Sequence, residues 1–277
     1  MEMKSVKEAV VKGYGKLAKS TRNKLIPKLF ACCDLTENAR KVGETIGYSK
    51  EELESVPKNS NLGVGCGNPA ALLDIKQGDT VTDLGSGAGF DAFIVSPIVG
   101  ETGTVIGIDL SDEMLDLARG NAKKGDYKNV TFVKGDIEQL PLPDETSEHI
   151  ISNCVINLSL NKGDVYKEAH RILKKGGTLS VSDIVLEQAL PDFIKDSVAA
   201  HIACVSGAEK LADYIRYVEE AGFKDIKIVN KTAFPLELML ADPQVRKLAQ
   251  EMNFDLNGEE AKDIASRVRS ISLTARK

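Results

Sequence analysis

The chain has 277 residues, of which 42% are hydrophobic, and a formal net charge of −5 at neutral pH. This length can bury the core of one α/β domain with appended segments, and the acidic balance argues against a general binder of nucleic acids or membranes. The sequence has no apolar run long enough to cross a bilayer, and its first residues, MEMKSVKEAVVKGYGK, form a charged amphipathic pattern rather than a signal peptide. We therefore expect a cytoplasmic protein whose five cysteines are mostly reduced thiols.

Strand-like and helix-like segments alternate along the chain. Residues 4–19 and 21–33 have helical patterns, and Ser49 with Glu52 three residues later predicts a capping box at the start of a short helix. The segments that follow are predicted as strands at 81–84, 104–109, 130–134, 147–153 and 177–183, with helices at 90–98, 112–124 and 161–173 between them. The Lys-Lys-Gly-Gly run at 174–177 predicts a helix end with a glycine cap.

The C-terminal part of the chain has fewer signals. A helical insertion from Leu190 to Gly207 precedes a helix at 209–221, a strand at 224–230 and a closing strand near 267–274. The βαβα order with short connections predicts a doubly wound, mainly parallel sheet with helices on both faces, hence an α/β fold. We expect a division into an N-terminal helical cap at 1–60, a core at 61–230 with an insertion at 187–208, and a C-terminal segment at 231–277 that supplies the closing strand.

A glycine-rich turn follows the first predicted core strand. In VTDLGSGAGFD (residues 81–91), three glycines alternate after Asp83, whereas a dinucleotide fingerprint needs its third glycine one residue later, where this chain has Phe90. Glycine removes the Cβ that would block close approach of the backbone to a ligand, and it permits a positive φ in the turn. The spacing favours S-adenosylmethionine over NAD as the ligand.

Acidic residues end two further predicted strands. Asp109 ends TVIGID, where its carboxylate can accept hydrogen bonds from both ribose hydroxyls, and Met114 on the next helix offers an apolar contact for adenine. The strand at 130–134 is followed by Gly135 and Asp136, whose carboxylate can accept from the adenine amino group. Each feature alone is common, but the ordered set predicts a nucleoside-bearing ligand at the carboxyl edge of the sheet.

Three cysteines lie in segments where packing is a poor explanation. Cys66 lies between two glycines in a turn, Cys154 follows the strand at 147–153, and Cys204 lies in the insertion before Gly207. We expect them to converge at the crevice at the carboxyl edge of the sheet. Their spacing matches neither a disulfide framework nor a zinc site, because no Cys-x-x-Cys pair and no histidine at zinc spacing is present. Converging thiols suit a soft, three-coordinate centre, and inert burial as small hydrophobic residues is the alternative.

Five motifs carry a family resemblance: NLGVGCGNP (61–69), DLGSGAGFD (83–91), SNCVINL (152–158), EAHRILKKGGTLSVSD (168–183) and HIACVSGA (201–208). Together they resemble the class I S-adenosylmethionine-dependent methyltransferases and, within that superfamily, the arsenite methyltransferases. The resemblance runs from about the N-terminus to Phe223 and fades beyond it. It implies a seven-stranded, Rossmann-like sheet and the methylation of trivalent arsenic in arsenic detoxification.

The resemblance implies a role for each candidate site residue. The thiolates of Cys66, Cys154 and Cys204 would bind As(III), whose lone pair can attack the sulfonium methyl in line, so that no general base is needed. The residues expected to bind S-adenosylmethionine are Asp83, Gly85, Gly87, Gly89, Asp109, Met114, Asp136, Ile137 and Asn153.

A vicinal pair, Cys32 and Cys33, lies in the N-terminal helical pattern. Members of the family carry an N-terminal cysteine or pair that forms a disulfide with the equivalent of Cys66 during turnover, which releases the product and requires thioredoxin or glutathione as reductant. The resemblance therefore implies a catalytic role for one of the two residues, without indicating which. Packing on the apolar face of a helix through Leu29 and Phe30 is the alternative.

Two other functions are compatible with parts of the pattern. A methyltransferase for a small carbon or oxygen nucleophile would use the same cofactor site, with the cysteines as packing residues. A non-catalytic, thiol-based arsenite binder would need the cysteines alone, and the glycine turn, Asp109 and Asp136 argue against it because such a protein has no use for them.

Overall fold

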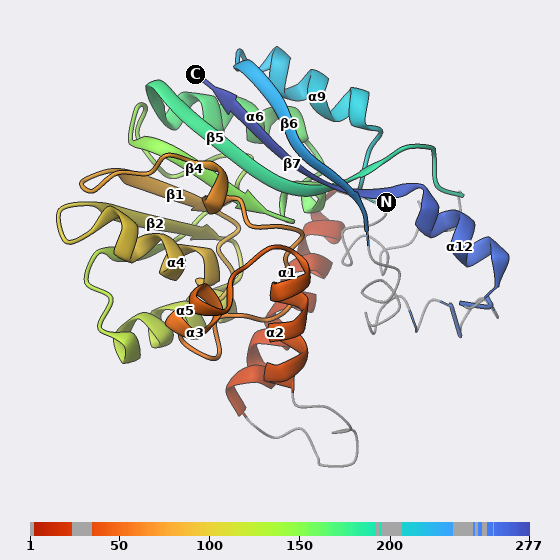
Figure 1. The fold of residues 1–277 in the computed structure, drawn as a ribbon, viewed down its shortest axis with the longest axis horizontal. Helices are drawn as coiled ribbons and strands as arrows, with labels where there is room; N and C mark the ends of the chain where they lie inside the picture. The colour runs from red at the N-terminus through yellow and green to blue at the C-terminus, as the bar shows by residue number, and fades with distance from the viewer. Residues whose placement is uncertain are drawn as a thin grey trace.

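The structure, a computed structural model, describes residues 3–23, 35–191, 194, 207–234, 246, 249–250, 254–256 and 258–277. Within these residues seven strands form one sheet in the order β3-β2-β1-β4-β5-β7-β6, with helices on both faces (Figure 1). Strands β1 to β5 run parallel to one another, and β7 pairs antiparallel with both β5 and β6. The predicted doubly wound, mainly parallel sheet is therefore confirmed.

The strands lie close to their predicted positions. Their bounds are β1 Thr80–Leu84, β2 Thr104–Asp109, β3 Val130–Lys134, β4 Ser147–Asn153, β5 Leu173–Leu186, β6 Lys224–Ala233 and β7 Val268–Arg276. The central strand β1 is buried from Val81 to Leu84, as expected for a parallel strand that is covered on both faces.

The helices cover the two faces of the sheet. Their bounds are α1 Met3–Asn23, α2 Leu35–Thr45, α3 Lys50–Ser55, α4 Phe90–Val99, α5 Asp112–Gly125, α6 Lys162–Ile172, α9 Leu211–Glu220 and α12 Glu259–Ser266, with 3-10 turns η2 Ala70–Leu72 and η3 Ile156–Leu158. Phe93 of α4 and Leu115 of α5 pack in one apolar cluster, whereas Tyr166 of α6 and Tyr214 of α9 pack in another. No helix in the described part of the chain is long and apolar enough to cross a membrane.

One of the two predicted helix-end motifs is confirmed and the other is wrong. The capping box is confirmed, since Glu52 N donates to Ser49 Oγ over 3.1 Å and Ser49 N donates to Glu52 Oε2 over 2.7 Å. The glycine cap predicted at 174–177 is wrong: α6 ends at Ile172, and the next residue, Leu173, is extended and begins β5. Leu173 is fully buried, so core packing ends the helix earlier than the local glycine signal suggests.

The parallel strands bring their carboxyl ends to one edge of the sheet. Helices α1 and α2 lie beyond that edge in Figure 1, and α1 packs against α5. The chain folds this way because each βα unit returns the chain to the same end of the sheet, where the connecting loops collect. Most of the insertion predicted at 190–207 lies outside the described residues.

Candidate functional site

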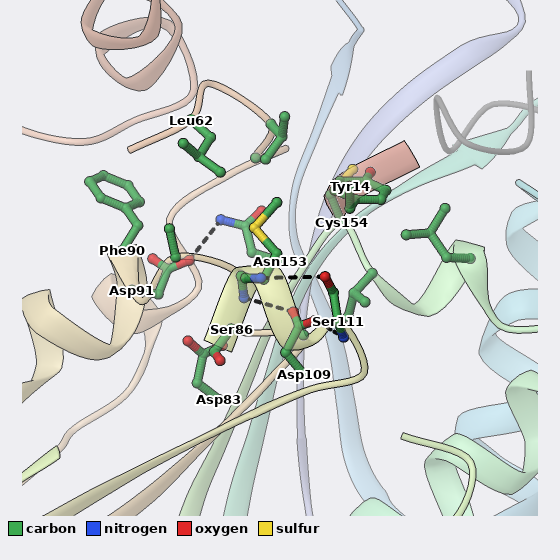
Figure 2. Close-up of a pocket in the computed structure, with 18 of the residues that line it drawn as sticks. Tyr14, Leu62, Asp83, Ser86, Phe90, Asp91, Asp109, Ser111, Asn153 and Cys154 are labelled. Carbon is green, nitrogen blue, oxygen red and sulfur yellow. Dashed lines mark hydrogen bonds between the residues drawn. The ribbon is translucent and has the colours of Figure 1, made fainter. Parts of the chain in front are cut away.

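A cavity lies at the carboxyl edge of the sheet, between α1 and the loops that follow β1 to β4 (Figure 2). Of the nine residues predicted to bind the cofactor, eight line it: Asp83, Gly85, Gly87, Asp109, Met114, Asp136, Ile137 and Asn153. Cys154 lines the same cavity, and so do Lys7 and Tyr14 from α1. The structure thus brings together residues as far apart in the sequence as Lys7 and Cys154.

The three glycines of the turn have different surroundings. All have a positive φ, +71° at Gly85, +52° at Gly87 and +90° at Gly89. A Cβ on Gly89 would lie 2.6 Å from the ring of Phe132, behind the cavity wall, whereas a Cβ on Gly87 would have no atom within 4 Å. Gly87 is therefore where a ligand can approach the backbone, and Gly89 serves the packing of α4 against the sheet.

Asp109 is held in one orientation by backbone amides. Gly87 N donates to Asp109 Oδ2 over 2.9 Å, and Ser111 N donates to Asp109 Oδ1 over 2.8 Å (Figure 2). Burial raises the pKa of this carboxyl, and the hydrogen bonds from Ser111 and Gly87 oppose that rise. Each carboxylate oxygen has a second lone pair, which leaves acceptors for a ligand in the cavity.

Two buried polar atoms at the cavity wall have no protein partner among the described residues. They are Asp83 Oδ2 and Ser86 Oγ. Burial and, after it, the nearby charge of Asp91 raise the pKa of Asp83 well above its ordinary value. Buried polar groups are normally hydrogen-bonded, so both atoms indicate a polar ligand, and a cationic group beside Asp83 would restore its ionised form.

Helix α1 is tied to the loops on the far side of the cavity by an ion pair that sequence reasoning missed. Lys7 Nζ lies 2.7 Å from Asp136 Oδ2 and 2.6 Å from Glu138 Oε2. Glu138 in turn accepts a hydrogen bond from Ser159 Oγ over 2.7 Å. The Asp136 carboxylate therefore binds Lys7 of α1 and also lines the cavity.

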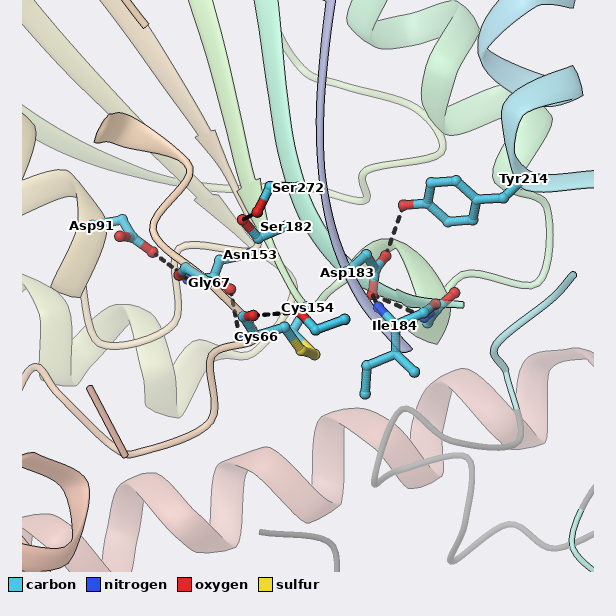
Figure 3. Close-up of a disulfide and its surroundings, with 12 residues drawn as sticks. Cys66, Gly67, Asp91, Asn153, Cys154, Ser182, Asp183, Ile184, Tyr214 and Ser272 are labelled. Atoms are coloured by element: carbon cyan, nitrogen blue, oxygen red, sulfur yellow. Dashed lines mark hydrogen bonds between the residues drawn. A yellow bond between two sulfur atoms is a disulfide. The ribbon is translucent and has the colours of Figure 1, made fainter. Parts of the chain in front are cut away.

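Cys66 and Cys154 are joined by a disulfide, with their Cα atoms 5.5 Å apart (Figure 3). The predicted convergence of these two residues is confirmed, but the expectation that they are separate thiols is wrong for this structure. A sequence separation of 88 residues carries no signal of pairing. Cys204, Cys32 and Cys33 lie outside the described residues, and within the described residues no cluster of His, Cys, Asp and Glu could hold a metal ion.

The backbone around both cysteines is fixed by side chains and by a neighbouring strand. Cys66 N donates to Asn153 Oδ1 over 2.8 Å, and Ser270 Oγ of β7 donates to Cys66 O over 2.7 Å. Cys154 has a left-handed backbone with φ +57°, and its N–H donates to Ser182 O over 2.8 Å. This turn ends the regular alternation of β4 and directs residue 154 towards the Cys66 loop.

Comparisons with known proteins agree with this geometry. Residues 75–222 match the family described as "Methyltransferase domain". The chain is 41% identical over 200 residues to an arsenite methyltransferase of Halobacterium salinarum and 35% identical over 231 residues to one of Aquipseudomonas alcaligenes, alignments that cover 72% and 80% of this chain. A solved structure of an arsenic(III) S-adenosylmethionine methyltransferase from Chlamydomonas reinhardtii is similar with a TM-score of 0.60 at 30% identity, covering 86% of this chain and 72% of that one.

The chain spans 51% and 63% of the length of these two curated relatives. These relatives therefore extend beyond the part of their sequences that matches this chain. The shared sheet is that of the class I methyltransferases, as the sequence motifs predict.

Proposed function

Because the chain belongs to the methyltransferase-domain family and, within it, to the arsenite methyltransferases, we propose that it transfers the methyl group of S-adenosylmethionine to thiolate-bound trivalent arsenic. The observation that carries this proposal is the position of Cys154, which lines the cofactor cavity and is bonded to Cys66 at the same edge of the sheet. A sulfur ligand at the cavity wall can hold a soft acceptor next to the methyl donor.

The residues of the cavity fit S-adenosylmethionine. The unpartnered Asp83 Oδ2 suits the ammonium of the methionine part, and the open position at Gly87 permits close approach of the ligand to the turn. The oriented carboxylate of Asp109 suits the ribose hydroxyls. Met114 and Ile137 offer apolar contacts to adenine at the cavity wall. When bound, the ligand supplies an electrophilic methyl group on a sulfonium.

Cys66, Cys154 and Cys204 are the proposed ligands of arsenic. Soft thiolates prefer soft, polarizable acceptors, and the first two residues are already within bonding distance of each other. Cys66 and Cys154 pack in an apolar cluster with Ile184 and Val268, and only 5% and 7% of their surfaces are exposed. Cys204 is proposed from the HIACVSGA motif alone, because it lies outside the described residues.

The proposed chemistry needs orientation more than acid–base catalysis. The arsenic lone pair forms the new As–C bond as the C–S bond breaks, and that bonding pair leaves on sulfur to give S-adenosylhomocysteine. Arsenic has no proton to lose in this step, so the protein contributes alignment and a dry site. Transfer raises the formal oxidation state of arsenic from III to V, and its return to III requires two electrons.

A thiol reductant of the thioredoxin or glutathione class is the proposed source of these electrons. Closure of a Cys66–Cys154 disulfide releases two electrons, and the bond between these residues supports such a step. A thiolate of the reductant would then attack the disulfide and restore both thiols. Cys32 and Cys33, outside the described residues, are candidates to receive the disulfide from Cys66.

Mass spectrometry of arsenic species tests this function. The protein is incubated with arsenite, S-adenosylmethionine and a dithiol, and we expect methylated arsenic from the unaltered chain and none from the Cys154→Ser variant. A hydroxyl is a hard ligand that stays protonated near neutral pH and cannot replace the thiolate. Calorimetry of S-adenosylmethionine binding to the same variant is the control, and it should show nearly unchanged affinity. Normal arsenic turnover by Cys154→Ser would remove the thiolate from the proposal, and turnover of an organic acceptor alone would favour an ordinary small-molecule methyltransferase.

A further inference from the structure

The side-chain amide of Asn153 forms hydrogen bonds with two backbone groups of the Cys66 loop, one N–H and one C=O. Its Oδ1 accepts from Cys66 N over 2.8 Å, and its Nδ2 donates to Gly67 O over 2.8 Å (Figure 3). The approach is close, since a Cβ on Gly65 would lie 3.0 Å from Asn153 Nδ2. The position of the Cys66 backbone therefore depends on which way this amide faces.

A buried pair selects the orientation of the amide. Asn153 Nδ2 also lies 3.1 Å from Asp91 Oδ2 and 2.9 Å from Tyr48 Oη, so its two hydrogens are shared among three acceptors, and Tyr48 Oη donates to Asp91 Oδ1 over 2.5 Å. Tyr48 is 4% exposed and Asp91 6% exposed, so water does not compete for these bonds. Three chain segments meet here: the turn after α2, the start of α4 and the end of β4.

The protonation states of the pair agree with these roles. Burial raises the pKa of Asp91 to about 6, which leaves it an ionised acceptor near neutral pH. Burial and the charge of Asp91 raise the pKa of Tyr48 well above its ordinary value, so the phenol stays a donor. A carboxylate can only accept hydrogen bonds, so Nδ2 of Asn153 must face Asp91, which leaves Oδ1 to face Cys66 N.

We propose that Tyr48 and Asp91 are positioning residues for the Cys66 sulfur, acting through the amide of Asn153 to hold the Cys66 loop against Cys154. Neither residue is an obvious candidate from the sequence. This inference rests on the proposed function only in that both sulfurs serve arsenic. Positioning raises the effective concentration of Cys66 towards Cys154, which can be measured without arsenite or S-adenosylmethionine.

The measurement is the equilibrium between dithiol and disulfide at Cys66 and Cys154 in glutathione redox buffers, read by peptide mapping after acid quench. Asp91→Asn places an amide nitrogen against Tyr48 Oη or Asn153 Nδ2 and removes the charge that selects the orientation of the Asn153 amide, so the acceptor of Cys66 N is held less firmly. We expect the equilibrium constant for disulfide closure to fall about 10-fold, the effect of one net hydrogen bond. Tyr48→Phe removes one donor and should lower it about threefold, whereas the matched control Tyr127→Phe, whose hydroxyl bonds to Ser55 O, should leave it unchanged.

A second-site exchange separates positioning from general packing. In the double variant Asp91→Asn/Asn153→Asp the donor and the acceptor trade places: the new amide at position 91 donates to the new carboxylate at position 153, which still accepts from Cys66 N. We expect closure to recover part of the way to that of the unaltered chain, because the second carboxylate oxygen at position 153 then faces Gly67 O, and two acceptors repel each other. A double variant as poor as Asp91→Asn alone would overturn the proposal, and so would a folded Asp91→Asn variant with unchanged closure.

Thermal unfolding accompanies each variant. If Asp91→Asn does not fold, Tyr48→Phe decides the matter, because loss of one hydroxyl leaves the ring packed on Phe90. Unchanged closure in folded Tyr48→Phe would then contradict the role of the pair. A protein that shows the predicted closure series but no arsenic methylation would contradict the proposed function and leave the positioning role standing.

Discussion

Lys7 of α1 has its Nζ 2.7 Å from the carboxylate of Asp136, which follows β3. Lys7 and Asp136 are both about 30% exposed, so their ion pair is partly screened by water. It closes α1 over one side of the cavity, where the adenine of S-adenosylmethionine is proposed to bind. Helix α1 therefore acts as part of the cavity wall.

Lys7→Ala is expected to raise the dissociation constant of S-adenosylmethionine about 1.4- to fivefold, because a partly exposed ion pair contributes only about 0.2–1 kcal/mol. In about 0.5 M salt the difference in affinity between Lys7→Ala and the unaltered chain should shrink, because salt screens the ion pair. Lys19→Ala is the matched control, since Lys19 joins α1 to Glu113 away from the cavity lining. Calorimetry at two salt concentrations checks this, and equal effects of both variants would assign Lys7 to general helix packing.

The two glycines at positions 87 and 89 should separate binding from stability. Gly87→Ala should cost about 1 kcal/mol of stability for its left-handed backbone and should weaken cofactor binding, because its Cβ points into free space of the cavity. Gly89→Ala should destabilise by about 2–4 kcal/mol, since its Cβ also collides with Phe132 and Phe93. Chemical denaturation and calorimetry on both variants test this pair. The same loss of stability in both would contradict it.

Asp109→Asn is expected to weaken S-adenosylmethionine binding by about 1.5–3 kcal/mol, or roughly 10- to 150-fold, because hydrogen bonds to a charged acceptor are lost. The control is Asp112→Asn, three residues along, whose carboxylate is exposed and pairs with Lys134. Calorimetry without arsenite is sufficient. An affinity of Asp109→Asn that matches the control would remove Asp109 from the cofactor site.

The raised pKa of Asp183 should make the free energy of unfolding depend on pH. It is fully buried and accepts from Asn157 Nδ2, Ile184 N and Tyr214 Oη, and burial raises its pKa from 3.8 to about 6. Between these two values the folded state keeps a proton that the unfolded state releases, so the contribution of this group to stability is complete below pH 3.8 and is lost as the pH rises through 6.

Asp183→Asn should remove that dependence. The free energy of unfolding of the unaltered chain, relative to the variant, should fall by roughly 3 kcal/mol between pH 4 and pH 7, at 1.4 kcal/mol per pKa unit. Urea denaturation at several pH values measures it. Parallel pH profiles for the two proteins would show that Asp183 titrates in the folded state as it does in the unfolded chain.

Most of the sheet could be predicted because its signals are local. Each strand is a short apolar run, each glycine turn or cap lies within a few residues of it, and the capping box at Ser49 and Glu52 needs only a spacing of three. The error at 174–177 has a tertiary cause. Burial of Leu173 and its pairing with Ser147 of β4 begin a strand where the local pattern indicates a helix end.

The site residues that could not be predicted from the sequence depend on contacts between distant segments. Tyr48 meets Asn153 across 105 residues, and Ser270 meets Cys66 across 204. A lone tyrosine after a helix, or a serine in a closing strand, carries no pattern that predicts such a partner. The acidic strand ends were predictable because topology alone brings them to one edge, whereas these side chains depend on how the N-terminal segment and β7 close over it.

The transfer of a labelled methyl group in a single turnover tests the proposed reaction most directly. Protein in excess over arsenite, reduced beforehand with a dithiol, receives S-adenosylmethionine that carries a trideuterated methyl group, and mass spectrometry follows arsenic and S-adenosylhomocysteine together. We predict one trideuteromethyl–arsenic product for each S-adenosylhomocysteine formed, and neither product when arsenite is omitted. Formation of S-adenosylhomocysteine with the label on another acceptor, or no transfer by a protein that binds both ligands, would contradict methylation of arsenic by this chain.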